Sequence, residues 1–499
     1  MGTNDMRVAI IGSGASGIAA AYYLMDRGID DVTLFEKAAQ MGGTWRDNRY
    51  PGVACDVPSH LYRFTFAPNA EWTQRCSPGD EIQRYMVDVA HKTGIYDHIR
   101  FDNEVTEAVY SDGRWSVTTD AGPQGIFDAV ISAGGALHHP KMPGIDGIDS
   151  FAGKACHSAR WDDTLDLGGK RVGIIGSGST GTQIVCAVAD VAAQLTLFQR
   201  TAQWIMHLPN HPIDEGKRQE YRDDAASMDS YYHYLADRFN SVFADAVSGH
   251  NAEAYAHMAQ ACMVNLNTNV HDPELRAKLT PDYKVGCKRL VVSDRFYQAI
   301  QQPNVHLETA DIAHIEPAGV RTADGILHSL DVIIYATGFH AHSLCHPMRI
   351  TGRDGGDLLE QWKTGNAAYR SVAVPGFPNW FMVGGPNSPI GNFSYLMTAE
   401  MQARYIASLI GEIAEGRART IEPKDDVTHA YNAQLRNAMA GTIWTSGCDS
   451  WYFDPQGRVA SYPWSYARFA EEMQVPALDD FIVERSFKRR MARRNRPQG

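Results

Sequence analysis

The chain has 499 residues, 44% of them hydrophobic and 21% charged, which is the composition of a folded protein of two or three domains. Its 46 lysines and arginines against 58 acidic residues give a net charge of −12, which argues against nucleic acid as a partner. No apolar stretch is long enough to span a membrane and the start lacks the form of a signal peptide, so we expect a cytoplasmic protein with no membrane partner.

Two further features of the composition receive simple interpretations. The 8 cysteines contain no C-x-x-C pair, so we expect reduced structural thiols, no metal site and no redox dithiol. The basic stretch at 487–496 is interpreted as a solvated chain end without an assigned role.

The first predicted element is a strand at 7–11, followed by a glycine-rich turn and an alanine-rich helix. Gly12 allows the tight turn, Gly14 lets a pyrophosphate approach the backbone, and Gly17 permits close packing of helix on strand. A second strand at 32–35 ends in Glu36, at the distance where a carboxylate binds the ribose hydroxyls of an adenosine. The pattern predicts a site for FAD or NAD; the simpler alternative is a glycine-rich turn beside a surface glutamate.

The same order of elements recurs after a strand at 171–175, where the turn contains Gly176, Gly178, Ser179, Thr180 and Gly181. The strand that follows, 195–198, ends in Gln199-Arg200 where the first copy ends in Glu36-Lys37. A carboxylate at this place would repel a 2′-phosphate, whereas a guanidinium binds it through paired hydrogen bonds. The second site is therefore predicted to bind NADP, unless Arg200 is an ordinary surface arginine.

Apolar strands at 130–135 and 331–339 are interpreted as exits that pass the chain between two domains. The expected fold is α/β, with two Rossmann-like dinucleotide-binding domains, one for FAD and one for NADP, and a helical insertion in the NADP domain. The expected parts are 1–150 (FAD domain, first part), 151–204 (NADP domain, first part), 205–283 (helical insertion), 284–338 (NADP domain, second part) and 339–499 (FAD domain, second part, and C-terminal lid).

The segment 151–162 resembles the fingerprint F-x-G-x-x-x-H-x-x-x-W-[P/D] of the type I Baeyer–Villiger monooxygenases, a family of class B flavoprotein monooxygenases. Trp161 stands where the sister group, which oxidises nitrogen and sulfur, has another aromatic residue, so this position favours ketone oxidation. From its place between the domains, His157 is interpreted as a hydrogen-bonding hinge residue and not as a proton-transfer catalyst.

Three further regions resemble the family. Residues 42–45 and 49–59 are similar to its flavin-proximal loops, and 286–297 is similar to the stretch with its active-site arginine. Residues 444–452 are similar to a C-terminal loop that covers the nicotinamide. The resemblance implies bound FAD and NADPH, with a ketone and O2 as the small-molecule partners. It also implies attack of a C4a-peroxyflavin on the ketone carbonyl, with one oxygen atom inserted to form an ester or lactone.

The resemblance assigns roles to individual residues. Arg289 would stabilise the negative charge that develops on the carbonyl oxygen, and Asp56 would hold that guanidinium, although an Asp before Val-Pro also shapes turns. The cofactors would be held in addition by Gly43, Thr44, Trp45, Thr201, Lys288 and Asn387, of which Thr201 and Lys288 would face the 2′-phosphate.

Three other functions fit the residues less well: Trp161 and Arg289 disfavour the first, no cysteine pair suits the second, and the paired glycine motifs with Arg289 argue against the third. An amine- or sulfide-oxidising flavin monooxygenase would use the same cofactors; a flavin disulfide reductase would need a dithiol; a nonenzymatic sensor or scaffold would bind NADP(H) without turnover. The identity of the ketone and the oligomeric state do not follow from the residues.

Overall fold

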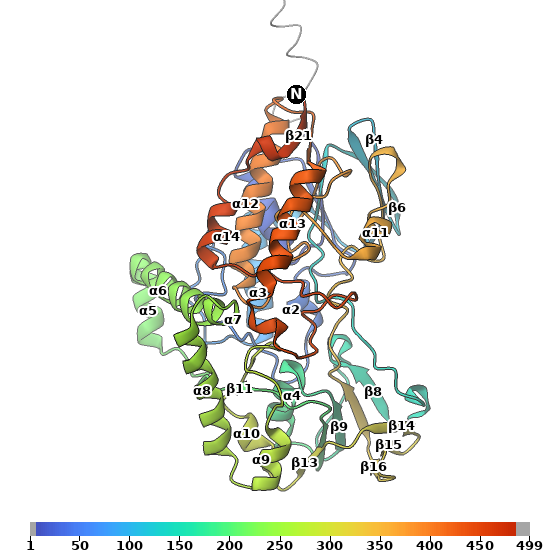
Figure 1. The fold of residues 1–499 in the computed structure, drawn as a ribbon, viewed down its shortest axis with the longest axis vertical. Coiled ribbons are helices and arrows are strands. Elements are labelled where there is room, and N and C mark those ends of the chain that lie inside the picture. The colour runs from blue at the N-terminus through green and yellow to red at the C-terminus, as the bar shows by residue number, and fades with distance from the viewer. Residues whose placement is uncertain (1–5, 486–499) are drawn as a thin grey trace, which may run out of the picture.

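The structure of the chain is a computed structural model that describes residues 6–485, so the basic stretch at 487–496 lies outside the described residues. Two parallel sheets, each flanked by helices, lie one above the other in Figure 1. No helix within residues 6–485 is long and apolar enough to cross a bilayer.

The first sheet has the strand order β19-β7-β1-β2-β3, and all of its pairings are parallel. Its strands are β1 (Val8–Ile11), β2 (Val32–Phe35), β3 (Ile99–Arg100), β7 (Ala129–Ser132) and β19 (Trp380–Met382). The residues of β2, β7 and β19 are all buried, as expected for strands with both faces covered. Helices α1 (Ala15–Met25) and α12 (Tyr395–Ala414) pack against each other beside this sheet.

The second sheet has the order β13-β10-β9-β17-β8 and is also fully parallel. Its strands are β8 (Lys154–His157), β9 (Arg171–Ile175), β10 (Gln194–Phe198), β13 (Val305–Glu308) and β17 (Val332–Tyr335), with α4 (Ser179–Val188) and α10 (Phe296–Ala299) packed alongside. Because β8 pairs with β17, the fingerprint segment lies directly beside the strand that leads back to the first domain.

His157 lies at this junction, at the end of β8. Its Nδ1 accepts a hydrogen bond from the backbone N–H of Ala159 at 3.1 Å, and its ring packs against Phe339 at a centroid distance of 6.0 Å. Both contacts are structural, which fits a residue that orders the connection between the domains.

Helices dominate the chain between the short paired strands β11 (Ile205–Met206) and β12 (Val291–Val292). They are α5 (Glu215–Asp223), α6 (Ala225–Arg238), α7 (Asp245–Val247), α8 (Ala252–Asn269) and α9 (Pro273–Leu279), with a π-helical turn at Phe239–Ala244. In Figure 1 they form the green arm beside both sheets.

The remaining elements complete the two domains. Beside the first sheet lie the helices α2 (Thr44–Asp47), α3 (Gly79–Lys92), α11 (Leu358–Gln361), α13 (Asp425–Met439) and α14 (Tyr466–Glu472). Two further groups of strands lie there: the antiparallel pair β20 (Thr420–Pro423) and β21 (Phe481–Glu484), and the sheet of β4 (Val105–Ser111), β5 (Arg114–Thr119), β6 (Gly122–Phe127) and β18 (Arg349–Thr351). An antiparallel sheet of β14 (Ile312–Glu316), β15 (Gly319–Thr322) and β16 (Leu327–Ser329) adjoins the second domain. The predicted α/β class with two dinucleotide-binding folds is confirmed; the residue boundaries between the parts stay a prediction.

Candidate active site

A cavity of about 2020 Å³ lies at the carboxyl ends of both parallel sheets. Its walls come from both glycine-rich turns, the two crossover segments around 136–145 and 336–348, and the C-terminal loop 448–457. A pocket for one small ligand measures ~300–1,000 Å³, so this cavity has room for more than one. Carboxyl ends of parallel strands are where α/β folds place their ligands.

The first glycine-rich turn brings its backbone close to the neighbouring strand and to the cavity. Gly12 has a φ of +104°, and a Cβ there would lie 2.8 Å from the carbonyl oxygen of Ala133. A Cβ on Gly17 would collide with the Gly12 carbonyl, which explains why α1 can pack so close to β1. In the described chain no side chain caps the N-terminus of α1 at Gly14, so its amides remain available to a phosphate.

Glu36, at the end of β2, is only 3% exposed and is held beside this turn. Its carboxylate accepts hydrogen bonds from the Ser13 hydroxyl at 2.7 Å and the Ser13 amide at 3.1 Å. Nη1 of Arg46 donates to the same carboxylate at 2.6 Å. The sequence interpretation missed Ser13 and Arg46, because neither contact follows from spacing along the chain.

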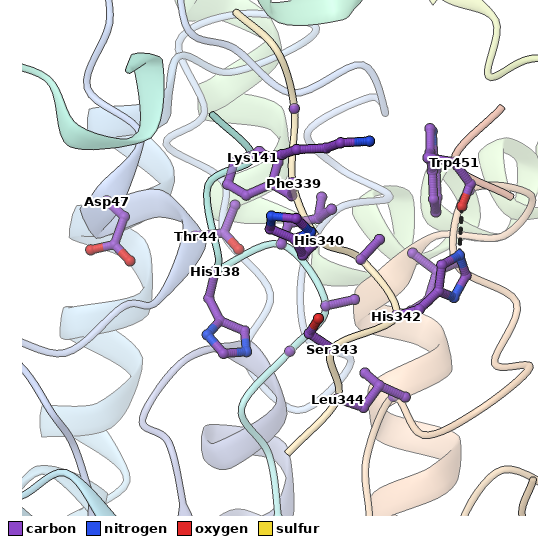
Figure 2. A pocket seen from close by; sticks show the side chains of 18 of the residues that line it. Thr44, Asp47, His138, Lys141, Phe339, His340, His342, Ser343, Leu344 and Trp451 are labelled. Atoms are coloured by element: carbon purple, nitrogen blue, oxygen red, sulfur yellow. Dashed lines mark hydrogen bonds between the residues drawn. The ribbon is translucent and has the colours of Figure 1, made fainter. Parts of the chain in front are cut away.

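The flavin-proximal residues predicted by resemblance also face the cavity. Gly43, Thr44 and Trp45 line it at the start of α2, and Trp45 is fixed by donating its Nε1–H to the Tyr62 hydroxyl at 3.1 Å. A Cβ built on Gly14 would lie 3.5 Å from the Gly43 Cα, so the two glycines let the loops approach closely. In Figure 2, Asp47 lies to the left of the other labelled residues, and Thr44 is drawn between Asp47 and His340 of the second crossover.

The second glycine-rich turn repeats this design. Gly176 has a φ of +113°, and a Cβ on Gly181 would collide with the Gly176 carbonyl. Gly178, Ser179 and Thr180 line the cavity at the N-terminus of α4, which again lacks a side-chain cap among the described residues. Both turns therefore fit a pyrophosphate, which needs close access to backbone amides.

Two cations meet at the far side of this second turn. Arg200 is exposed, Lys288 is partly buried, and both line the cavity together with Thr201. Burial lowers the pKa of the Lys288 ammonium, Asp449 opposes this, and the nearby Arg200 lowers it further. Two neighbouring cations of this kind suit a phosphate monoester, as the 2′-phosphate of NADPH would supply.

Arg289 and Asp56 form an ion pair within the cavity wall although 233 residues separate them. Nη2 of Arg289 donates to Oδ2 of Asp56 at 2.5 Å. The Asp56 charge raises the pKa of Arg289 against the opposing effect of burial, so the guanidinium stays protonated at any working pH. The pair that sequence resemblance predicted is thus brought together.

The C-terminal loop closes the cavity from another side. Figure 2 shows His342, in the second crossover, hydrogen-bonded through Nε2 to the backbone carbonyl of Trp451 at 2.8 Å. Cys448, in the same loop, forms a disulfide with Cys287, two residues before Arg289. The expectation that all cysteines are reduced thiols is therefore wrong; the partners are 161 residues apart, and only tertiary structure brings them together.

Three predicted binding residues do not line the main cavity. Gly17 and Gly181 lie behind the turns, where they set the packing of helix on strand. Asn387, with a φ of +61°, lines an adjoining pocket of about 30 Å³ together with His342 and Trp451. The remaining predicted site residues surround one space.

Comparison with known proteins agrees with this geometry. Residues 5–347 match the family described as flavin-binding monooxygenase-like. The chain belongs to this family. Among curated relatives, a Baeyer-Villiger monooxygenase of Streptomyces coelicolor is 39% identical over 485 residues, covering 96% of this chain and 93% of the relative. An uncharacterized monooxygenase of Mycobacterium tuberculosis is 47% identical over 462 residues, covering 92% of each chain.

Solved structures resemble this flavin monooxygenase over nearly its whole length. The closed structure of a cyclohexanone monooxygenase has a TM-score of 0.86 at 30% identity, and an oxidized steroid monooxygenase bound to NADP has 0.87 at 27%. Each comparison covers 96% of this chain and 99% of the other. This flavin monooxygenase is thus an FAD- and NADPH-dependent enzyme of the Baeyer–Villiger type.

Proposed function

We propose that this enzyme inserts one oxygen atom beside the carbonyl of a ketone, with Arg289 as the residue that stabilises the developing oxyanion. The observation that carries the proposal is the Arg289–Asp56 pair, which lies in the wall of the cavity shared by both dinucleotide sites. A fixed guanidinium in a site shielded from water stabilises an oxyanion far better than it would in bulk solvent.

In this proposal the two turns hold the two cofactors. The FAD residues are Gly12, Gly14, Gly17, Glu36, Gly43, Thr44, Trp45 and Asn387; the NADPH residues are Gly176, Gly178, Ser179, Thr180, Gly181, Arg200, Thr201 and Lys288. Bound FAD would activate O2, the source of the inserted oxygen atom, and bound NADPH would supply the hydride that reduces the flavin. Glu36 binds ribose hydroxyls, and Arg200 with Lys288 binds the 2′-phosphate.

The chemistry left to the protein is positioning and charge. Asp56 orients Arg289 by accepting from Nη2, so the other N–H groups of the guanidinium can donate to the substrate carbonyl. The carbonyl is polarised, and the negative charge that forms on its oxygen is balanced by a group that cannot lose its proton.

Arg289→Ala tests the assignment. Reduction of the flavin by NADPH persists, because it precedes attack on the carbonyl, while ester or lactone formation falls by about 10²–10³, as for removal of an oxyanion donor. Stopped-flow absorbance follows reduction, and mass analysis of products from cyclic, linear and aryl ketones follows oxygen insertion.

Arg295→Ala is the matched control, since Arg295 forms an exposed ion pair with Asp190 outside the cavity and should leave both half-reactions unchanged. Ester formation that survives in Arg289→Ala removes Arg289 from the mechanism. Products formed only from amines or sulfides would instead assign the sister activity, which the Baeyer-Villiger relatives do not favour.

A further inference from the structure

Tyr452 lies in the C-terminal loop and is only 3% exposed. Its ring stacks on Trp451 at a centroid distance of 4.5 Å and packs against Trp444 at 5.5 Å. The ring belongs to a core formed with α8 and α13, so in the described chain the aromatic face is not part of the cavity wall. The hydroxyl oxygen of Tyr452 lies at the edge of this core, beside Arg289.

The position of Gly391 shows how closely these groups meet. A Cβ on Gly391 would lie 2.7 Å from the Tyr452 hydroxyl oxygen and 3.1 Å from Nη1 of Arg289. The phenol and the guanidinium therefore converge on one point, where only a glycine, here with a φ of +104°, leaves room for both. Asp56 occupies the other side of the guanidinium at Nη2.

The phenol is a neutral partner for the guanidinium. Burial raises the pKa of Tyr452, and the positive charge of Arg289 only partly opposes this. A protonated phenol accepts a hydrogen bond from the guanidinium without cancelling its charge, unlike a second carboxylate. The phenol can therefore orient the Arg289 guanidinium while the guanidinium keeps the positive charge that stabilises an oxyanion.

Covalent and polar contacts fix the loop that carries Tyr452. The Cys287–Cys448 disulfide joins it to the chain segment of Arg289, four residues before Tyr452 and two before Arg289. On the other side, His342 binds the carbonyl of Trp451 at 2.8 Å (Figure 2). Tyr452 therefore directly follows a short segment that is held at Cys448 and at Trp451, and this fixes where its hydroxyl meets Arg289.

We propose that Tyr452 is a positioning residue for Arg289: its phenol and the Asp56 carboxylate hold the guanidinium from two sides, so that its free donors point into the cavity. The inference rests on the proposed function of Arg289. It assigns the C-terminal loop a part in oxygen insertion, because this loop carries the hydroxyl that helps to orient Arg289.

Tyr452→Phe tests this, because it removes one hydroxyl and keeps the ring in its core. The rate of ester formation falls about tenfold, the loss expected when a charged group loses one hydrogen bond. Flavin reduction by NADPH, the dissociation constant of NADP+ from absorbance titration, and the thermal unfolding midpoint stay at their wild-type values. The fraction of NADPH that ends as hydrogen peroxide rises.

Tyr405→Phe is the matched control: Tyr405 is also a buried phenol near an arginine, with Arg370 5.9 Å from its ring, and it is not part of the cavity wall in the described structure. It should change none of these quantities. Equal losses in reduction, NADP+ affinity and ester formation would overturn the proposal in favour of a structural role, as would wild-type ester formation in Tyr452→Phe. Ester formation retained in Arg289→Ala would instead remove the proposed function itself.

Discussion

The two glycine-rich sites use the same scaffold and differ in what stands at the end of the second strand. In the first, the Ser13 hydroxyl donates to the carboxylate of Glu36, which stays buried beside the turn. In the second, the equivalent Ser177 donates to the backbone carbonyl of Thr201 at 2.8 Å, and Arg200 stays exposed. One serine therefore fixes an acid for ribose hydroxyls, while the other leaves a cation free for a phosphate.

The charged residues next to Glu36 and Arg200 also differ between the two sites. Glu36 is paired with Arg46, which also pairs with Asp47, so one guanidinium balances only part of the negative charge at the first site. Arg200 has Lys288 as its neighbour, and each raises the positive potential around the other. The difference between an adenosine ribose and a ribose phosphate is thus built from charge balance on otherwise similar folds.

The largest effects are expected from a matched pair of changes at the third glycines. In Gly17→Val and Gly181→Val the added side chain meets a backbone carbonyl, so the helix must move away from its turn. Gly17→Val should yield protein without FAD, whereas Gly181→Val should remain yellow and bind NADPH about 10²-fold more weakly. Flavin absorbance per protein and titration with NADPH check both. Loss of the same cofactor in both variants would refute the assignment of separate sites.

Glu36→Gln removes the charge that Arg46 and Ser13 hold. Arg46 keeps its ion pair with Asp47, so the free energy of unfolding should change little, but FAD should dissociate readily because its ribose hydroxyls lose a charged acceptor. Unfolding with and without added FAD measures this. Glu308→Gln, at the end of β13 in the second domain, is the control and should leave FAD retention unaltered. Full FAD retention in Glu36→Gln would exclude the ribose role.

Arg200→Ala should raise the Michaelis constant for NADPH about 10- to 100-fold, because a charge-assisted contact to the phosphate is lost. The constant for NADH should hardly change, because NADH has no 2′-phosphate. Steady-state kinetics with both coenzymes checks the prediction, with Arg295→Ala as the control. Equal effects on NADPH and NADH would place the phosphate elsewhere.

The smallest effect concerns pH. The pKa of Lys288 is lowered, so its contribution to NADP+ affinity is present below that pKa and is lost as pH rises through it. Arg200→Ala removes one of the charges that lower the pKa of Lys288, so the loss of NADP+ affinity should move to higher pH. Titrations with NADP+ from about pH 7 to about pH 10 measure this shift. An unchanged pH dependence would show that Arg200 and Lys288 do not act on one phosphate.

The sequence alone predicted the two dinucleotide folds, which the comparisons confirm, and most of the residues that we propose to bind the cofactors. Strand, glycine turn, helix and acid or arginine are local in the chain, with spacings set by backbone geometry, so Gly12, Glu36, Gly176 and Arg200 could be found without any tertiary contact. The pair of Arg289 and Asp56 came from family resemblance and not from spacing.

Only the tertiary structure decided what surrounds those residues. Three contacts join distant parts of the chain: Arg46 with Glu36, Cys287 with Cys448, and Tyr452 with Arg289. No periodicity or spacing encodes such contacts, because they depend on how separate elements dock. The residues that complete each site were therefore visible only after the two sheets and the C-terminal loop had been assembled around one cavity.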